Sequence, residues 1–178
     1  MSRSICVFCG SSFGDDPRYT AAARDTGIGI ARRGWTLVYG GGRVGLMGVV
    51  ANAALEAGGR VAGVIPRFLY DREVGHDGLS ALELVPALTE RKIRMGELSD
   101  AFLSLPGGVG TMDELFEMWS WTQVGLQQKP SGLLNVAGYY DGLVAFVDRA
   151  AADGFMKPEH RAMLVVEETI DALLDRLA

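Results

Sequence analysis

A glycine-rich turn between an apolar segment and a helix-forming segment most restricts the folds open to this chain. The turn, residues 106–111, reads Pro-Gly-Gly-Val-Gly-Thr and follows the apolar run 101–105. Such a run is typical of a buried parallel strand, and the segment after the turn is typical of a helix. Amide N–H groups in a turn of this kind can face an anion at the helix N-terminus. The sequence therefore predicts a strand, a phosphate-binding turn and a helix in succession.

The same alternation of strands and helices recurs along the whole chain. Continuously apolar strands separated by helices are typical of a parallel sheet covered on both faces. We therefore predict an α/β fold, a doubly wound, Rossmann-like parallel sheet in one domain of residues 1–178. The predicted strands are 5–9, 35–39, 60–65, 82–85, 101–105, 132–135 and 164–166, and the predicted helices are 17–33, 46–57, 88–99, 111–124, 139–153 and 169–177, with an irregular loop at 67–80.

Composition narrows the class of partner. The net charge is −5, the sequence pI is about 5.0 and no dense Lys/Arg stripe occurs, which disfavours nucleic acid as a partner. No apolar run of about 18 residues and no signal-peptide pattern is present, so we expect no membrane association and a cytoplasmic location. Glycine is frequent, at 24 of 178 residues, and many glycines fall at predicted strand-to-helix turns. These features favour a small-molecule ligand bound by loops.

The cysteines and histidines give little support for a metal or redox site. Cys6 and Cys9 form a C-x-x-C, but Cys6 lies inside an apolar strand rather than at a helix N-terminus. We interpret both as reduced structural thiols, with redox or metal work as the weaker alternative. His76 and His160 do not share a metal-ligand spacing with them. We therefore predict no metal and no cofactor.

Four turns are predicted to meet at one edge of the sheet. In an open parallel sheet, ligands bind outside the carboxyl ends of the strands. The turns at 10–14, 40–45, 66–73 and 106–111 all follow predicted strands, and Arg91 and Glu114 lie near the starts of the next helices. We therefore expect Arg91 and Glu114 to share a site with the glycine-rich turn.

The glycine pattern at residues 40–45 matches G-x-G-x-x-G but does not fit a nicotinamide enzyme. It follows the second strand, and about 20 residues later the chain has Arg60 or Ile65 instead of a ribose-binding acid. Leu46 and Met47 stand where a Walker A loop needs Lys and Ser/Thr. Dinucleotide binding and ATP hydrolysis are both disfavoured, while glycines present only for turn geometry stay an alternative.

Structural alternatives also exist for the single site residues. Glu114 can serve as an acid favoured near a helix N-terminus, although Asp113 already fills that role. Arg91 and Lys92 can form a solvated helix face. Beyond these, Trp119 and Trp121 are two residues apart and cannot share one helix face, so we expect one of them in the core.

In these motifs the chain resembles the Lonely Guy family of cytokinin-activating phosphoribohydrolases, once widely labelled as lysine decarboxylases. Leu88-Thr89 stands where many relatives carry Met-His, so the preferred nucleobase stays open. The resemblance runs from residues 7–12 to residues 138–140 and includes the glycines at 40–42 and 45–48, Arg91-Lys92, residues 106–111 with Glu114, and the segment 129–136.

The resemblance implies hydrolysis of the N-glycosidic bond of an N6-modified adenosine 5′-monophosphate, or of AMP itself, by a homodimer. Free base and ribose 5-phosphate would be the products. Arg91 and Glu114 are implied as catalytic residues, and the predicted substrate contacts are Glu73, Arg91, Lys92, Gly107, Gly108, Val109, Gly110, Thr111, Gly41 and Gly42.

The chemistry of the residues agrees with that activity. Cleavage of the bond builds positive charge on the ribose, which a fixed carboxylate such as Glu114 can stabilise, or the carboxylate can activate water. Arg91 can neutralise the phosphate or align Glu114, and the sequence does not separate these roles. A pyridoxal-dependent decarboxylase needs a lysine in a cofactor-binding pattern, and none of Lys92, Lys129 and Lys157 has one. A non-catalytic carrier of a nucleotide or phosphate ligand is the alternative from another class.

Overall fold

Seven parallel strands form one sheet in the order β4-β3-β2-β1-β5-β6-β7. This all-parallel pairing confirms the parallel sheet that the sequence predicts. The computed structural model describes residues 3–178, apart from the side chain of Glu73. The strands are β1 (Ser4–Phe8), β2 (Thr36–Tyr39), β3 (Arg60–Pro66), β4 (Ala81–Val85), β5 (Ala101–Ser104), β6 (Ser131–Leu134) and β7 (Leu164–Glu167).

The strand order places β1 at the centre of the sheet. Val7 of β1 lies opposite Tyr39 of β2 on one side and Leu103 of β5 on the other. From β1 the chain first builds the sheet outward to β4, and it then crosses back to β5 and builds outward to β7. The loops that leave β1 and β5 therefore lie side by side at the point where the winding direction reverses, which is where doubly wound sheets bind ligands.

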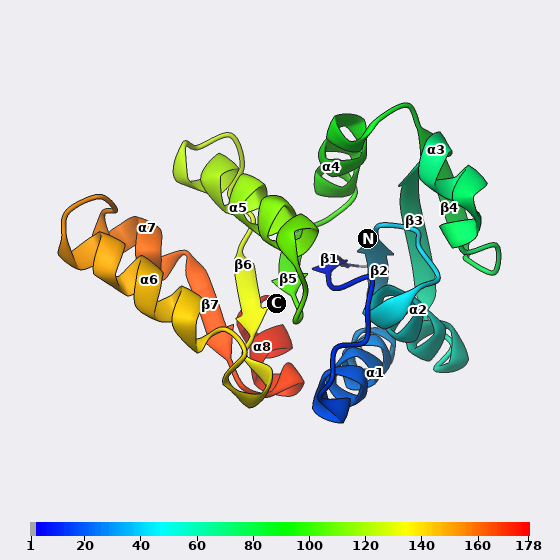
Figure 1. The fold of residues 1–178 in the computed structure, drawn as a ribbon, viewed down its shortest axis with the longest axis horizontal. Helices are drawn as coiled ribbons and strands as arrows, with labels where there is room; N and C mark the ends of the chain where they lie inside the picture. The colour runs from blue at the N-terminus through cyan, green and yellow to red at the C-terminus, as the bar shows by residue number, and fades with distance from the viewer. Residues whose placement is uncertain (1–2) are drawn as a thin grey trace.

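Helices cover both faces of the sheet (Figure 1). Along β1 the side chains alternate, so that Ile5 and Val7 pack under α1 and α2 while Cys6 and Phe8 face the opposite helices. Among the described residues, no helix is long and apolar enough to cross a bilayer. One face carries α1 (Pro17–Arg32), α2 (Gly45–Glu56) and α8 (Ile170–Arg176), and the other carries α4 (Leu88–Glu97), α5 (Val109–Gln123) and α6 (Asp141–Ala152).

Several element boundaries differ from the sequence prediction. The segment predicted as an irregular loop contains α3 (Arg67–Leu69) and a π-helical turn, η1 (Tyr70–Val74), and α7 (Pro158–Ala162) was not predicted. Helix α5 begins at Val109, two residues early, because the low helix propensity of valine and glycine hides its first turn. Glu114 therefore lies in the second turn of α5.

The turn before α6 also differs from the prediction. A 3-10 turn, η2 (Val136–Gly138), precedes α6, and α6 begins at Asp141 instead of residue 139. Ala137 (φ 54°) and Gly138 (φ 73°) both have left-handed backbone conformations. These residues interrupt the helix, and Tyr140 (φ −95°, ψ 5°) is its N-cap, so the helix begins only at Asp141.

Candidate active site

A cleft of about 600 Å³ opens at the reversal point, between the loops that follow β1, β2 and β5. The side of the cleft nearest β5 is polar, and the side formed by α2, β3 and the 67–80 segment is apolar. The lining residues are Cys9, Gly10, Ser11, Gly40, Gly42, Val44, Met47, Ile65, Leu69, Val74, Arg91, Gly108, Val109, Gly110, Thr111 and Glu114.

The N-terminus of α5 presents unpaired amide groups to this cleft. Gly108 is the N-cap of the helix, and no side chain caps it. Within the described residues, the N–H groups of residues 107–111 donate to no acceptor. The first N–H groups of a helix have no intrahelical partner and lie at the positive end of its dipole. These amides therefore form a cradle for an anion such as a phosphate.

Arg91 and Glu114 face each other across the cleft floor. Arg91 lies in the first turn of α4 and Glu114 in the second turn of α5, and their side chains are 13% and 12% exposed. Arg91 Nη2 lies 3.7 Å from Glu114 Oε1, which is too far for a hydrogen bond. The Nε of Arg91 is buried and has no hydrogen-bond partner within the described chain. Both groups are thus held close together without being bonded to one another.

The absence of a side chain at Gly40 makes room for Arg91. A Cβ built on Gly40 would lie 1.6 Å from Arg91 Nη2, so any other residue would displace the guanidinium. A second close approach occurs at Gly45 (φ 56°), where a Cβ would lie 2.2 Å from the backbone carbon of Ser11. The glycine pattern after β2 therefore seats Arg91 and lets α2 approach the β1 loop.

Burial raises the pKa of Glu114 to about 7. Arg91 lowers this pKa, but at 3.7 Å it offsets only part of the cost of removing the carboxylate from water. The nearby Asp113 carboxylate raises the pKa further. A carboxyl group with a pKa near neutrality can both accept and release a proton at physiological pH.

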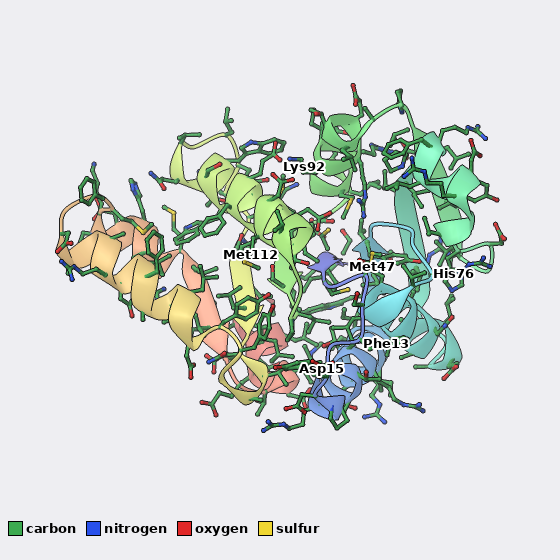
Figure 2. The ribbon with its side chains drawn as sticks, in the orientation of Figure 1. Phe13, Asp15, Met47, His76, Lys92 and Met112 are labelled. Carbon is green, nitrogen blue, oxygen red and sulfur yellow. The ribbon has the colours of Figure 1, made fainter. Side chains whose placement is uncertain are left out.

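Lys92 lies next to Arg91 in the sequence but points to a different place. Figure 2 shows it between α4 and α5. Its Nζ lies 2.9 Å from Asp113 Oδ2 and also pairs with Glu117. Burial lowers the pKa of Lys92, but hydrogen bonds to Glu117 and Asp113 outweigh it, and the net pKa is raised. Lys92 lines a separate, shallower depression on α5.

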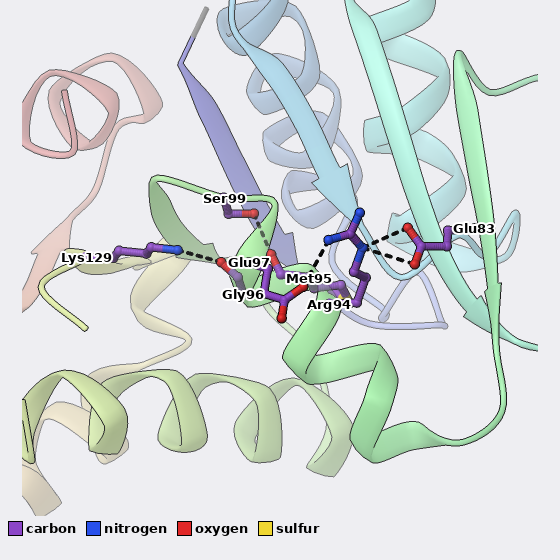
Figure 3. A network of polar contacts seen from close by, with 7 residues as sticks. All are labelled: Glu83, Arg94, Met95, Gly96, Glu97, Ser99 and Lys129. Carbon is purple, nitrogen blue, oxygen red and sulfur yellow. Dashed lines mark hydrogen bonds and ion pairs between the residues drawn. The ribbon is translucent and has the colours of Figure 1, made fainter. Parts of the chain in front are cut away.

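Polar contacts fix the C-terminal half of α4, the helix that carries Arg91 (Figure 3). Arg94 Nε donates to both carboxylate oxygens of Glu83 on β4, at 3.0 and 2.8 Å, and Arg94 Nη1 donates to Glu97 at 2.9 Å. Lys129 Nζ donates to the Gly96 carbonyl oxygen at 2.7 Å. These contacts hold α4 against β4 and against the segment before β6, and they thereby restrict the position of Arg91.

The 67–80 segment is attached to the glycine loop after β2. Gly42 and Gly75 form an isolated antiparallel bridge. The N–H of His76 donates to the Gly41 carbonyl oxygen at 3.0 Å, which fixes the segment beside the cleft. The backbone of Glu73 belongs to η1, and its side chain lies outside the described part of the structure.

Comparison with known proteins identifies the family. The family model described as "Possible lysine decarboxylase" matches residues 47–177. Over 175 residues, the chain is 46% identical to a cytokinin riboside 5′-monophosphate phosphoribohydrolase of Arabidopsis thaliana, covering 98% of this chain and 77% of the relative. The chain belongs to the Lonely Guy family. A second member, from Oryza sativa subsp. japonica and named "probable cytokinin riboside 5′-monophosphate phosphoribohydrolase", is 48% identical over the same share of both chains.

Solved structures support the fold of this Lonely Guy protein. A molybdenum cofactor binding protein from Rippkaea orientalis superposes with a TM-score of 0.75 at 20% identity, covering 99% of this chain and 95% of the other. A molybdenum cofactor carrier protein from Chlamydomonas reinhardtii gives a TM-score of 0.75 at 21% identity, covering 99% and 98%. At these identities the likeness shows the fold alone.

The structure brings together most of the residues that the sequence singled out in this Lonely Guy chain. Arg91 and Glu114 line one cleft, together with Gly42 and the cradle residues 108–111. Gly107 lines a neighbouring cavity, Gly41 accepts a hydrogen bond from His76 and does not line the cleft, and Lys92 lines the depression on α5. Sequence reasoning missed the apolar wall. Its residues are ordinary apolar side chains that belong to no motif, and only their positions near the ends of predicted strands could have indicated them. They are Val44, Met47, Ile65, Leu69 and Val74.

Proposed function

We propose that this protein hydrolyses the N-glycosidic bond of N6-modified adenosine 5′-monophosphates or of AMP, releasing the free base and ribose 5-phosphate. One observation carries the proposal. A buried carboxylate with a raised pKa, Glu114, lies beside an uncapped amide cradle in the same cleft, with Arg91 unbonded next to it. Hydrolysis of a nucleoside monophosphate, the activity in the names of the relatives from Arabidopsis thaliana and Oryza sativa, can use these groups together.

The cradle holds the 5′-phosphate. Five unpaired N–H groups at a helix N-terminus offer hydrogen bonds and a favourable dipole to a dianion. Thr111, whose hydroxyl has no partner among the described residues, adds a further donor. Anchoring the phosphate fixes the ribose, so that binding energy is converted into orientation at the reacting carbon.

Glu114 acts at the bond that breaks. As the C1′–N9 bond breaks, its electron pair leaves with the base and positive charge develops on the ribose. The ionised Glu114 stabilises this charge and accepts a proton from the attacking water, whose oxygen bonds to C1′. The proton then passes to the departing base. Arg91 keeps part of the Glu114 population ionised at neutral pH, because it lowers the Glu114 pKa.

The apolar wall receives the base. The apolar side chains of Val44, Met47, Ile65, Leu69 and Val74 provide a surface suited to a flat ring and an apolar N6 substituent. The cleft volume of about 600 Å³ accommodates a nucleotide. Glu73 and Gly41 remain proposed substrate contacts. The pairing of Lys92 with Asp113 and Glu117 instead supports a bracing role between α4 and α5, and the kinetics of a Lys92 variant test whether it also contacts substrate.

The direct test is incubation of the protein with AMP and with N6-isopentenyl-AMP, followed by chromatography for free base and ribose 5-phosphate. We expect release from at least one of them. Tight binding of both nucleotides without release would refute the hydrolase and support the carrier.

A pyridoxal-dependent decarboxylase, as the family model's description would have it, does not fit the lysines. Lys92 Nζ is paired with two carboxylates and Lys129 Nζ donates to a carbonyl. No lysine is among the described residues that line the cleft. An internal Schiff base requires a lysine amine within reach of the cofactor. We expect no visible absorption band after incubation with pyridoxal phosphate and gel filtration.

We also propose a homodimer in the cytoplasm. Val109 is 87% exposed and Phe116 is 38% exposed, and both lie on the outer side of α5 beside the depression that Lys92 lines. Exposed apolar side chains grouped in this way favour a protein contact. Light scattering after gel filtration tests the dimer, with Phe116→Glu expected to give the monomer, and cell fractionation tests the location.

A further inference from the structure

Three consecutive carbonyl groups next to the cradle are held by donors from outside it. Tyr140 Oη donates to the Leu105 carbonyl oxygen at 2.5 Å. The Gly10 N–H donates to the Pro106 carbonyl oxygen at 3.0 Å, and Tyr139 Oη donates to the Gly107 carbonyl oxygen at 2.5 Å. Backbone orientation is thus specified peptide by peptide immediately before α5.

These contacts determine where the amide N–H groups point. The peptide bonds of the described residues are all trans, so each C=O is opposed to the N–H of the following residue. Because Tyr139 holds the Gly107 carbonyl, the Gly108 N–H is directed away from Tyr139. In the same way, the hydrogen bond from Gly10 to the Pro106 carbonyl directs the Gly107 N–H away from Gly10. Tyr139 lines a neighbouring cavity of about 300 Å³, which shares Gly10, Ser11 and Gly108 with the cleft, and it is not among the described residues that line the cleft. The Gly108 N–H, directed away from Tyr139, is therefore expected on the cleft side of the peptide.

Glycine at positions 107 and 108 makes such a restraint necessary. A Cβ on Gly107 would lie 2.1 Å from Thr111 Oγ1, so glycine is required there by close packing. A peptide between two glycines rotates at little steric cost, since both residues tolerate φ of either sign. Without an external donor, the Gly107–Gly108 peptide can present its carbonyl oxygen to the phosphate instead of its N–H.

The turn that carries Tyr139 is built at a conformational cost. Among the described residues, Ala137 is the one non-glycine residue with a positive φ, 54°. Asn135 Oδ1 accepts a hydrogen bond from the Tyr140 N–H at 2.7 Å, and Asn135 Nδ2 donates to Asp141 at 2.7 Å. A strained backbone retained by specific contacts commonly serves a functional geometry.

We propose that Tyr139 is a positioning residue that holds the Gly107–Gly108 peptide in the orientation needed to bind the substrate phosphate. It acts through the backbone and does not touch the reacting atoms. The strained turn at Ala137 brings its hydroxyl to the Gly107 carbonyl. This inference rests on the proposed function for the identity of the anion.

The test compares Tyr139→Phe with the wild type for ligands with and without a phosphate. We expect the Kd of AMP and that of ribose 5-phosphate, measured by calorimetry, to rise about fivefold to tenfold, as loss of one hydrogen bond implies. The Kd of adenosine should stay within twofold. In the hydrolysis assay, KM for AMP should rise by the same factor while kcat changes less than threefold.

Tyr19→Phe is the matched control. Its ring packs edge-on against Tyr139 at 5.5 Å, and its hydroxyl has no hydrogen-bond partner among the described residues. We expect wild-type values for all three ligands. Equal losses for AMP and adenosine in Tyr139→Phe, or an unchanged AMP Kd with an intact melting temperature, would overturn the inference. If the wild type binds AMP without cleaving it, the hydrolase fails and the binding comparison still tests Tyr139.

Discussion

Two neighbouring pairs of charges connect α4 and α5, and they differ in geometry and in how deeply the carboxylate is buried. Arg91 and Lys92 are 13% and 17% exposed, but Glu114 is 12% exposed whereas Asp113 is 57% exposed. Lys92 makes hydrogen-bonded ion pairs with Asp113 and Glu117, whereas Arg91 stays 3.7 Å from Glu114. We call the hydrogen-bonded pairs of Lys92 the tight pair and Arg91 with Glu114 the loose pair. The two lie one residue apart along each helix.

The difference shows how one helix contact can provide both a brace and a reactive site. Ion pairs with short hydrogen bonds satisfy their charges and hold the helices together. Burial raises the pKa of Glu114 to about 7, and a guanidinium held 3.7 Å away offsets only part of that cost. Because Arg91 and Glu114 do not hydrogen-bond to each other, both can form hydrogen bonds with a substrate.

Removal of the Glu114 carboxylate should have the largest effect on activity. We expect Glu114→Gln to lower kcat/KM for AMP at least ~100-fold, because a positioned acid–base group is lost. Asp113→Asn changes the neighbouring residue of the tight pair and should retain activity within about threefold. Equal losses in both variants, in a coupled assay for ribose 5-phosphate, would show that the two pairs do not differ in function.

The same substitution should alter the pH dependence of stability. A carboxyl whose pKa is raised in the folded state keeps its proton longer than in the unfolded chain. Its contribution is therefore lost as pH rises from the unfolded pKa of about 4.5 through about 7. We expect the wild-type free energy of unfolding, measured in urea, to fall by about 2 kcal/mol relative to Glu114→Gln between pH 5 and pH 8.

Parallel pH curves for the two proteins would contradict this prediction. Such curves would mean that Glu114 ionises normally in the folded protein. The loose pair would then be a weak surface contact rather than a buried reactive group.

Arg91 should control the pH at which activity appears. If the ionised Glu114 is needed, kcat/KM rises about tenfold per pH unit below pH 7 and levels above it. Arg91 lowers the Glu114 pKa, so Arg91→Gln should move this limb to higher pH by about one unit. Arg176→Gln, which removes the ion pair of Arg176 on α8 with Glu167, should leave the limb in place. A limb that falls with rising pH would instead assign Glu114 as a general acid.

The tight pair should matter mainly for stability. We expect Lys92→Met to lower the free energy of unfolding by about 1 kcal/mol, since two ion pairs are lost. Its kcat/KM should stay within about fivefold of wild type. Arg149→Met, which removes an exposed pair with Asp153, should change stability by less than about 0.5 kcal/mol. A loss of activity beyond tenfold for Lys92→Met would place Lys92 among the substrate contacts, as the resemblance implied.

The sheet and the cradle could be predicted because local patterns determine them. Continuous apolar runs such as 101–105 indicate buried parallel strands, and the glycines with Thr111 indicate a turn at a helix start. The prediction that Trp119 or Trp121 lies in the core is also confirmed, since Trp119 is buried and Trp121 is partly buried. Each of these features depends on a few consecutive residues.

The orientation of side chains from different elements could not be predicted in this way. Whether Arg91 or Lys92 points into the cleft depends on how α4 is rotated against α5, which Arg94, Glu83 and Lys129 help to set. The backbone contact of Tyr139 with Gly107 joins residues 32 positions apart. Such contacts arise only from tertiary packing, and no sequence period reveals them.

The cradle of amide groups has a consequence for how this protein can change over evolutionary time. Backbone N–H groups belong to every non-proline residue, so most point mutations leave them in place. The wall of Val44, Met47, Ile65, Leu69 and Val74 consists of side chains, each of which a single mutation can enlarge or shrink. Under the proposed function, descendants of such a chain can therefore diverge in the base they accept while inheriting the same requirement for a phosphate.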